Sequence, residues 1–264
     1  MYQFDYQKPK TLADAVKLAQ TADAKVLAGG MTLIPTMKQR LAQPSAVIDL
    51  GALSELKGIR LDGQTLVIGA GTRHFDVANN EVVKRAIPAL AELAAHIGDP
   101  AVRHRGTIGG SVANNDPAAD YPAALVALGA EVRTTKRNVA AEDFFQGMFA
   151  TALEDGEIIK EIAFPVPKRA AYEKFPNPAS RYAMVGVFVA DTGKGARVGV
   201  TGAGPGVFRA KDMEAALAKS FTPKAVEGIK ISPDGLNSDI HGSAEYRAHL
   251  VTVMASRAVA RAAG

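Results

Sequence analysis

The stretch Thr107-Ile108-Gly109-Gly110-Ser111-Val112-Ala113-Asn114-Asn115-Asp116-Pro117-Ala118-Ala119-Asp120 places a glycine pair shortly before an expected helix start. Without side chains, Gly109 and Gly110 let a ligand reach backbone amides, and a helix N-terminus nearby favours an anion. Asp116 is a good N-cap and is followed by proline, so we expect a helix over residues 117–128. Asp120, one turn inside it, is placed to accept hydrogen bonds from sugar-type hydroxyls. The stretch therefore predicts a phosphate-containing ligand.

A second, weaker copy of this arrangement lies near the start of the chain. Val26-Leu27-Ala28 indicates a short buried strand, which Gly29-Gly30 and then Met31-Thr32-Leu33 follow. Thr32 is placed to cap the next helix. Two such turns suit a ligand with two phosphates, although either alone could be a tight turn without a ligand. The basic run Arg103-His104-Arg105 either helps to hold a pyrophosphate or is a solvated loop.

Other local signals give a coarse secondary structure. We expect helices near residues 12–19, 75–95 (interrupted at 79–80 and restarted at 88), 212–219, 222–228 and 243–261. We expect strands at residues 46–50, 131–134 and 157–164, and hairpins formed by residues 59–61 with 66–68 and by 182–190 with 196–201. Pro165-Val166-Pro167-Lys168-Arg169 is the clearest linker, because its prolines block both helix and central strand.

The two glycine turns and the Asp116-Pro117-Ala118-Ala119-Asp120 run resemble the FAD-binding medium subunit of the molybdenum hydroxylases, which include carbon monoxide dehydrogenase, xanthine dehydrogenase and aldehyde oxidoreductase. The resemblance extends over essentially the whole chain, including Phe4-Asp5-Tyr6, Tyr172-Glu173-Lys174-Phe175 and Pro178-Ala179-Ser180-Arg181-Tyr182. It implies an α+β fold, with an FAD-binding domain of two α/β lobes of the vanillyl-alcohol-oxidase (PCMH-like) type. A C-terminal α+β domain with a small antiparallel sheet and helices follows. We expect the first lobe at residues 1–55, the second at 56–167 and the C-terminal domain at 168–264.

The resemblance also implies which residues contact FAD. The first turn would line the pyrophosphate and ribityl part, mainly through main-chain amides, and comprises Val26, Leu27, Ala28, Gly29, Gly30, Met31, Thr32 and Leu33. The second would bind the pyrophosphate from the other side, with the Thr107 hydroxyl as an added donor, and comprises Thr107, Ile108, Gly109, Gly110 and Ser111. Asp120 would hold a hydroxyl of the cofactor.

Four further positions follow from the resemblance. Ile97 matches an apolar contact to the adenine end and Ile159 another apolar contact, although both could be ordinary core residues. Tyr182 is the candidate for a ring close to the isoalloxazine, with core packing as the alternative, and Lys174 is a further candidate. The chain departs from the family pattern at Ser111, which is usually Asn, and at Met31, where a polar residue is common.

By the same resemblance, the chain is an oxidoreductase subunit that transfers electrons. A large subunit with the molybdenum cofactor would oxidise the substrate, and a small subunit with a 2Fe-2S cluster would pass electrons to FAD. The acceptor would be a quinone, NAD or oxygen, and the complex a dimer of heterotrimers. The chain has no cysteine, so any cysteine-bound cluster must lie on another polypeptide. The spacing of its histidines indicates no metal site, and we expect no acid–base catalyst.

Composition agrees with this interpretation. The chain has 264 residues, 47% of them hydrophobic, which is enough for a full core. Its net charge of +4 comes from basic residues dispersed among acidic ones, which gives nucleic-acid binding little support. No apolar run is long enough to span a bilayer and no secretion signal is visible, so we expect a cytoplasmic location.

Two alternatives remain at this point. A free-standing FAD-dependent oxidoreductase would need a substrate pocket in the C-terminal domain, where the sequence shows no constellation of polar groups. A non-redox nucleotide-binding or assembly module would use the glycine turns alone. Flavin absorption in the purified protein would exclude the module, and activity without any partner would favour the free-standing enzyme.

Overall fold

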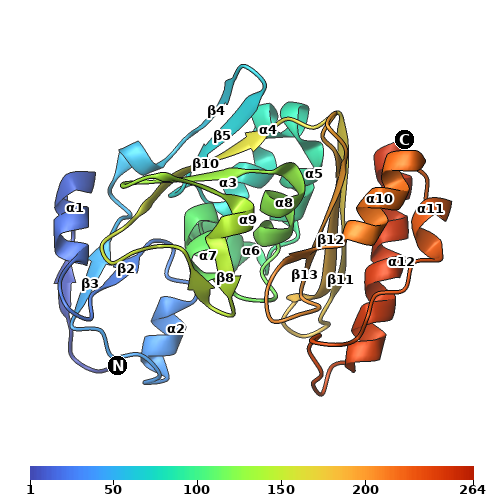
Figure 1. Ribbon diagram of the computed structural model, residues 1–264. Helices are drawn as coiled ribbons and strands as arrows, with labels where there is room; N and C mark the ends of the chain where they lie inside the picture. Colours follow the sequence, from blue (N-terminus) through green and yellow to red (C-terminus); the bar gives the residue numbers. More distant parts are fainter.

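The computed structural model describes residues 1–264 and contains three successive sheets (Figure 1). A three-stranded, a five-stranded and a four-stranded sheet follow one another from the N-terminus to the C-terminus, and a small two-stranded sheet accompanies the second. The fold is therefore α+β, as the sequence predicted. No helix combines the length and the apolar character needed to cross a membrane.

The first sheet is parallel and has β3 in its centre. Its lobe contains β1 (Asp5–Gln7), α1 (Leu12–Ala19), β2 (Lys25–Leu27), α2 (Leu33–Lys38), β3 (Ala46–Asp49) and the short helix η1 (Ser54–Leu56). Thr11 caps α1 by accepting from the Asp14 N–H at 3.1 Å. The expected burial of the strand at Val26 is wrong, because β2 is an edge strand and Val26 is 40% exposed.

The second sheet is antiparallel throughout, in the order β4-β5-β10-β6-β7. Its strands, with the small β8-β9 pair, are β4 (Ile59–Asp62), β5 (Thr65–Gly69), β6 (Glu131–Thr134), β7 (Asn138–Ala140), β8 (Phe145–Gly147), β9 (Ala150–Thr151) and β10 (Ile159–Pro165). The accompanying helices are α3 (His74–Asn79), α4 (Glu81–Ala86), α5 (Pro88–Ala95), α6 (Pro100–Arg105), α7 (Ile108–Asn114), α8 (Tyr121–Leu128) and α9 (Ala141–Phe144). Asn80 caps α4 and Pro88 begins α5, so both expected helix breaks are confirmed.

The helix expected over residues 117–128 begins later than the sequence suggested. The glycine pair does not precede a helix but lies inside the first turn of α7, with Thr107 as its N-cap. Asn115 ends α7 in the left-handed conformation (φ 44°), and Asp116 caps only a short turn by accepting from the Ala118 N–H. A separate helix, α8, then starts at Tyr121.

The basic run Arg103-His104-Arg105 is not a solvated loop, which was one of its two interpretations. It forms the C-terminal part of α6, whose N-cap is Asp99 and whose first residue is Pro100. An Asp-Pro pair therefore does start a helix in this chain, but at residues 99–100 rather than at 116–117.

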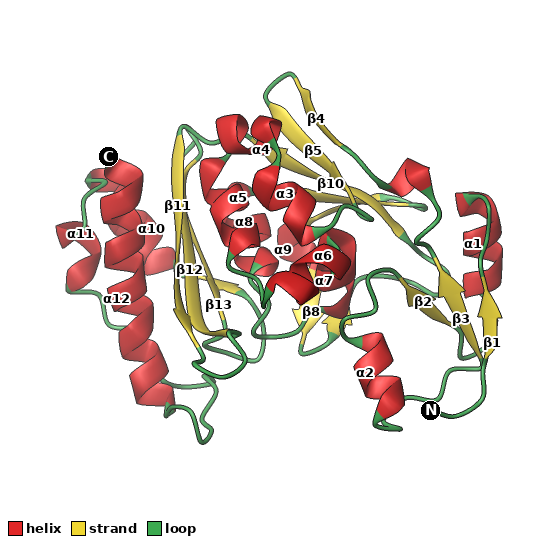
Figure 2. Cartoon of the chain, turned by 180° about the vertical axis from the view of Figure 1, so that it is seen from behind, coloured by secondary structure: helices red, strands yellow, loops and turns green.

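The third sheet has the order β11-β12-β13-β14 and is antiparallel. Its unit contains β11 (Arg169–Pro176), β12 (Ala183–Asp191), β13 (Ala196–Thr201), β14 (Phe208–Arg209), α10 (Lys211–Lys219), α11 (Lys224–Glu227) and α12 (Ala244–Ala263). The sheet has α5 and α8 on one face and α10 and α12 on the other (Figure 2). The sequence did not indicate β11, which is an edge strand with only two buried residues, Ala171 and Tyr172, and no strict alternation of buried and exposed positions.

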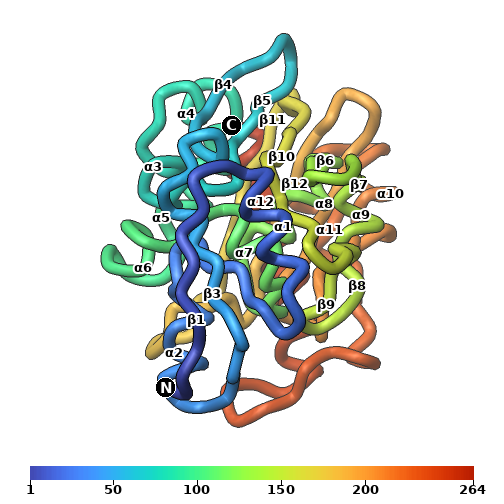
Figure 3. Tube along the Cα trace, turned by 90° about the vertical axis from the view of Figure 1, so that its left-hand side faces the viewer, coloured from blue at the N-terminus to red at the C-terminus, as the bar shows by residue number.

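The cores show how the parts are joined. A cluster of 30 buried residues extends from the second sheet to Tyr172 of β11 and Phe188 of β12. A separate cluster of only 7 buried residues underlies the first lobe and includes Ile158 from the second. Figure 3 shows the blue first lobe in front of the rest of the molecule. The sheets change between β3 and β4 and between β10 and β11. We keep residues 1–55, 56–167 and 168–264 as the proposed division.

Candidate binding cleft

The structure brings the two glycine turns together. A side chain at Gly29 would collide with the backbone, because an ideal Cβ there would lie 2.1 Å from the carbonyl oxygen of Arg105. An ideal Cβ at Gly110 would lie 3.8 Å from the Cβ of Ala28. The turn of the first lobe is thus seated on the backbone that leads into α7, and only glycine allows this approach.

The first turn presents a row of unbonded amides. The backbone N–H groups of residues 28–33 make no hydrogen bond to any other group of the chain. Gly29 and Gly30 are nevertheless buried, and Gly30 has a φ of +75°. Because buried N–H groups without a partner are costly, this turn is built to receive an acceptor such as a phosphate oxygen.

The second turn differs from the expectation in its hydrogen bonding. The Ile108 N–H donates to the Thr72 carbonyl at 3.0 Å and the Gly109 N–H to the Ala70 carbonyl at 2.9 Å. The Gly110 N–H donates to Oγ1 of Thr107 at 3.1 Å. These amides are satisfied within the chain, so the glycines here permit close packing, with an ideal Cβ at Gly109 lying 2.5 Å from that of Ala70. The Thr107 hydroxyl, which accepts from Gly110, still has its own proton to donate.

Two chambers share lining residues at the glycine turns. The smaller has a volume of about 340 Å³ and the larger of about 970 Å³. Both are within the usual range of about 300–1,000 Å³ for small-molecule sites. The residues that line both chambers are Gly29, Gly30, Thr32, Thr107, Gly110 and Asn114. An elongated ligand lying through both chambers would therefore have its middle at the unbonded amides.

The other candidate residues divide between the chambers. Those lining only the smaller chamber are Met31, Ile97, Ser111, Asp120 and Tyr182. Those lining only the larger are Val26, Leu27, Ala28, Leu33, Gly109 and Ile159. Ile108 and Lys174 line neither, because Ile108 is fully buried in the core and Lys174 is ion-paired to Asp120. Ile97 and Tyr182 line the same chamber, whereas the resemblance assigns them to different ends of the cofactor.

Two residues of the C-terminal domain hold the carboxylate of Asp120 in place. Its carboxylate accepts from the Tyr172 hydroxyl and from Nζ of Lys174, which lies 2.9 Å from Oδ1 and 3.0 Å from Oδ2. Burial raises the pKa of Asp120, while the charge of Lys174 and the hydrogen bonds from Tyr172 and Lys174 oppose that rise. These two hydrogen bonds use two of the roughly four acceptor sites of the carboxylate, so it can still accept a hydrogen bond from a ligand.

His74 was not singled out by the sequence. It lines the smaller chamber with 4% of its surface exposed, and its Nδ1 has no hydrogen-bond partner. Burial, with a smaller contribution from Arg103, lowers its pKa to about 4. The chamber therefore has a neutral imidazole in its wall at physiological pH. Nothing in the local sequence distinguishes this histidine from the others.

The basic run contributes one available cation. Nη1 of Arg103 donates to the carbonyls of Ile97 and Gly98, each at 3.0 Å, and Nδ1 of His104 lies 2.7 Å from the Pro100 carbonyl. The Arg105 side chain makes no hydrogen bond or ion pair and lines the larger chamber next to the first turn. Arg105 alone of the three is free to neutralise a bound anion.

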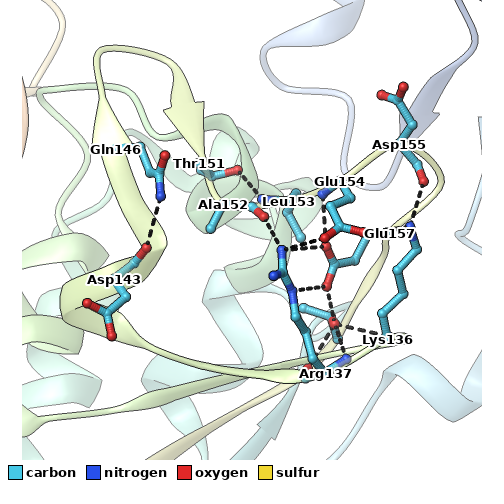
Figure 4. A network of polar contacts seen from close by, with 11 residues as sticks. Lys136, Arg137, Asp143, Gln146, Thr151, Ala152, Leu153, Glu154, Asp155 and Glu157 are labelled. Carbon is cyan, nitrogen blue, oxygen red and sulfur yellow. Dashed lines mark hydrogen bonds and ion pairs between the residues drawn. The ribbon is translucent and has the colours of Figure 1, made fainter.

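A polar network fixes one wall of the larger chamber (Figure 4). Glu157, whose side chain is fully buried, accepts from Oγ1 of Thr134 at 2.5 Å, from the Glu154 N–H at 2.8 Å and from Arg137. Burial would raise the pKa of Glu157, but these hydrogen bonds and the charge of Arg137 outweigh it and hold the pKa below its usual value. The network orders the segment that leads into Ile158 and Ile159, which line the chamber.

Comparison with known proteins covers the whole chain. Residues 2–167 match the family described as "FAD binding domain in molybdopterin dehydrogenase", and residues 170–262 match "CO dehydrogenase flavoprotein C-terminal domain". The carbon monoxide dehydrogenase medium chain of Afipia carboxidovorans is 39% identical, over 98% of this chain and 96% of that protein. The nicotine 6-hydroxylase medium subunit of Paenarthrobacter nicotinovorans is 35% identical, over 97% and 96%. The structure of the cyanide-inactivated Cu,Mo-CO dehydrogenase superposes with a TM-score of 0.89 at 37% identity, covering 98% of this chain and 97% of that one.

Proposed function

Because this chain belongs to the family of FAD-binding medium subunits of molybdenum hydroxylases, we propose that it holds one FAD across the glycine turns and serves as the electron-transfer subunit of such a complex. When bound, the cofactor supplies the ability to take up electrons one at a time and to release them singly or in pairs. The residues of this chain bind and orient it. None of them acts as an acid–base catalyst in this proposal.

The row of unbonded amides carries the proposal. The N–H groups of residues 28–33 lie where the two chambers meet, so a diphosphate there would satisfy them. Arg105 adds a positive charge beside them, and the Thr107 hydroxyl adds a donor from the opposite turn. The remaining residues proposed for the second turn act through packing rather than through their amides.

The two ends of the dinucleotide then occupy different chambers. We place the adenine in the larger chamber, against Ile158 and Ile159, and the isoalloxazine in the smaller one, with Ile97, Asp120 and Tyr182. The reason is Tyr182, which lines the smaller chamber and is, by the resemblance, the candidate for a ring close to the isoalloxazine. In this arrangement Ile97 contacts the isoalloxazine end rather than the adenine end.

The partners follow from the proposed role. A small subunit with a 2Fe-2S cluster would donate electrons, and a large subunit with the molybdenum cofactor would oxidise the substrate, in a cytoplasmic dimer of heterotrimers. A quinone, NAD or oxygen would accept the electrons. The relatives are named for substrates as different as carbon monoxide and nicotine, so similarity to them does not select the substrate of this complex.

Co-purification tests this proposal. The full chain, isolated with whichever subunits accompany it, is expected to contain about one flavin per chain, with the mass of FAD after release. Iron–sulfur absorption is expected in the same fraction. A colourless chain or the mass of a mononucleotide would refute the cofactor assignment. A yellow chain that turns over substrate with no iron–sulfur subunit would refute the electron-transfer role.

A further inference from the structure

One helix beside the cleft adds nothing to the core of the protein. α6 is the only helix of the chain that buries none of its residues, and in Figure 3 it lies at the left edge of the molecule. Its segment nevertheless lines both chambers. Asp99 and Val102 line the smaller one, and His104 and Arg105 line the larger. Few buried contacts beside a binding site are typical of an element that moves when a ligand binds.

The polar contacts of this segment are self-contained. The Asp99 carboxylate accepts from the Val102 N–H at 2.9 Å. The side chains of Arg103 and His104 contact only the carbonyls of residues 97, 98 and 100. Residues 99–105 thus make no hydrogen bond or ion pair to any residue outside 97–106. The segment can move as a unit without breaking a polar contact to the rest of the protein.

Glycines stand at both ends of the segment, next to fixed backbone. Gly98 has a φ of +53°, and an ideal Cβ there would lie 2.9 Å from a side chain of α6. Just before it, the His96 carbonyl accepts from Nζ of Lys174 at 3.1 Å. At the other end, an ideal Cβ at Gly106 would lie 2.6 Å from Nε2 of His74, and the Gly106 carbonyl accepts from the His74 N–H at 3.0 Å. Backbone rotation can therefore be confined to the two glycines.

A ring stack fastens the helix to its neighbour α3. The rings of His104 and Phe75 lie with their centroids 4.1 Å apart and their planes at 26°. Phe75 is 39% exposed, so water reaches the edge of this stack. At the end of the segment, the carbonyl oxygen of Arg105 lies against Gly29 of the first lobe without a hydrogen bond. The helix is held in place by contacts that are easily broken and remade.

The ligand itself can supply the missing attachment. The guanidinium of Arg105 has no partner in the chain and lines the larger chamber beside the unbonded amides of residues 28–33. An anion bound to those amides would attract the guanidinium and so hold the whole segment against the first lobe.

We propose that residues 99–105 form a hinged cover, which swings about Gly98 and Gly106 to admit the cofactor and closes over its diphosphate. This inference rests on the proposed function, and it adds how the site controls the entry and release of its ligand. Because entry and release both need the open position, a change that loosens or locks the cover alters both rates in the same direction.

Loosening the cover is expected to raise both rates. FAD is mixed with the deflavinated protein, isolated with its accompanying subunits, and flavin fluorescence gives the rate of association on mixing and of dissociation on dilution. His104→Ala removes the ring stack and is expected to raise each rate by about fivefold, the scale of one aromatic pair. His249→Ala, at an exposed position of α12, is the control. Loss of a direct contact with the cofactor would raise dissociation alone, so an unchanged association rate in His104→Ala would overturn the proposal.

A hinge variant tests the same mechanism away from the stack. Gly98→Ala places a methyl group against α6 in a left-handed conformation, which strains the closed position, and both rates are expected to rise by about fivefold. Gly63→Ala is the matched control, because Gly63 has a φ of +57°, lines neither chamber and has nothing within 4 Å of its ideal Cβ. Its rates are expected to equal those of the wild type.

A reversible tether should produce the opposite change. The chain has no cysteine, so Phe75→Cys with His104→Cys gives it two thiols, which a short bis-methanethiosulfonate reagent can join. Both rates are expected to fall by about tenfold or more in the tethered protein, as the open fraction falls. Dithiothreitol is expected to reverse this fall in the same sample. Wild-type protein taken through the same reagents accounts for thiols of the accompanying subunits.

The cover and the proposed function fail in different ways. Wild-type protein that takes up no FAD would overturn the proposed function. Uptake of FAD at rates that neither the tether nor Gly98→Ala changes would overturn the cover and leave the cofactor assignment intact.

Discussion

Nζ of Lys174 lies 2.9 Å from Oδ1 of Asp120, and only 5% and 4% of the two side chains are exposed. Lys174 belongs to β11 and Asp120 immediately precedes α8, so this buried ion pair joins the C-terminal sheet to the floor of the smaller chamber. The resemblance named both residues as cofactor contacts. The structure shows that Lys174 acts on Asp120 and has no surface in either chamber.

Removing the ammonium group of Lys174 is expected to leave the buried carboxylate of Asp120 without its charged partner. Lys174→Met keeps most of the side-chain volume, and we expect it to lower the free energy of unfolding by about 3–5 kcal/mol near pH 8. Urea denaturation measures the loss. Lys194→Met removes an exposed lysine from the turn after β12 and serves as the control. A Lys174→Met midpoint equal to that of the wild type would show that the pair contributes nothing to stability.

The same variant gives a pH dependence of defined sign. Burial raises the folded-state pKa of Asp120, and loss of Lys174 removes the main opposing influence. A group whose folded-state pKa is above its unfolded value contributes most at low pH, and this contribution is lost as the pH rises through the folded value. The deficit of Lys174→Met relative to the wild type is therefore expected to shrink as the pH falls towards about 4. A deficit that stays constant between pH 8 and pH 5 would contradict this account.

For His74 we expect the opposite pH dependence, with stability lost as the pH falls. Its folded-state pKa of about 4 is below the unfolded value of about 6.5, so its contribution is present above pH 6.5 and is lost as the pH falls towards 4. The shift corresponds to at most about 3 kcal/mol. The unfolding free energy of His74→Leu is expected to fall less than that of the wild type between pH 7 and pH 4.5. His249→Gln, at an exposed position, is expected to follow the wild-type curve.

A side chain at Gly110 is expected to block the junction of the two chambers. An ideal Cβ there already lies 2.9 Å from Oγ1 of Thr107, and valine would extend into the space facing Ala28. We expect Gly110→Val to remain folded by circular dichroism but to lose its flavin, measured as the ratio of visible to ultraviolet absorbance. Gly228→Ala, where an added Cβ meets nothing within 4 Å, is expected to keep it. Full flavin content in Gly110→Val would exclude the diphosphate from this junction.

Arg105 is expected to bind the cofactor through its charge. Arg105→Ala should weaken FAD binding by about tenfold, the scale of one charge-assisted hydrogen bond. The difference from wild type should diminish at high salt if the guanidinium acts partly at a distance. Arg85→Ala removes an exposed arginine of α4 that lines neither chamber and controls for the change in net charge. Equal FAD affinities of Arg105→Ala and wild type would remove Arg105 from the site.

Much of the fold was predictable from local signals. The Thr11 cap, the break at Asn80 and the start at Pro88 depend on a few neighbouring residues, and all are confirmed. β11 was missed because its buried and exposed positions do not alternate strictly. The helix start at Asp116 was misplaced because an Asp-Pro pair is equally compatible with the short turn that the structure has there.

The candidate site was less predictable from the sequence than the fold was. The glycine pairs revealed where two turns approach each other, but not which amides stay unbonded, since the partners of Ile108 and Gly109 are carbonyls of the distant residues Thr72 and Ala70. His74 was missed for a similar reason. A histidine nitrogen without a partner arises from the surrounding fold and leaves no mark in the adjacent sequence.

The small core of the first lobe has a consequence for the resistance of the protein to proteolysis. Its cluster has only 7 buried residues, one of which is Ile158 of the second lobe, so the first lobe has little core of its own. It also meets the second lobe where Gly29 lies against the backbone of Arg105. A diphosphate bound by both lobes would hold the first lobe against the second. The cofactor would then stabilise the fold of the protein as well as serve its function. Depletion of flavin would then expose the N-terminal segment to proteases before any other part of the molecule unravels.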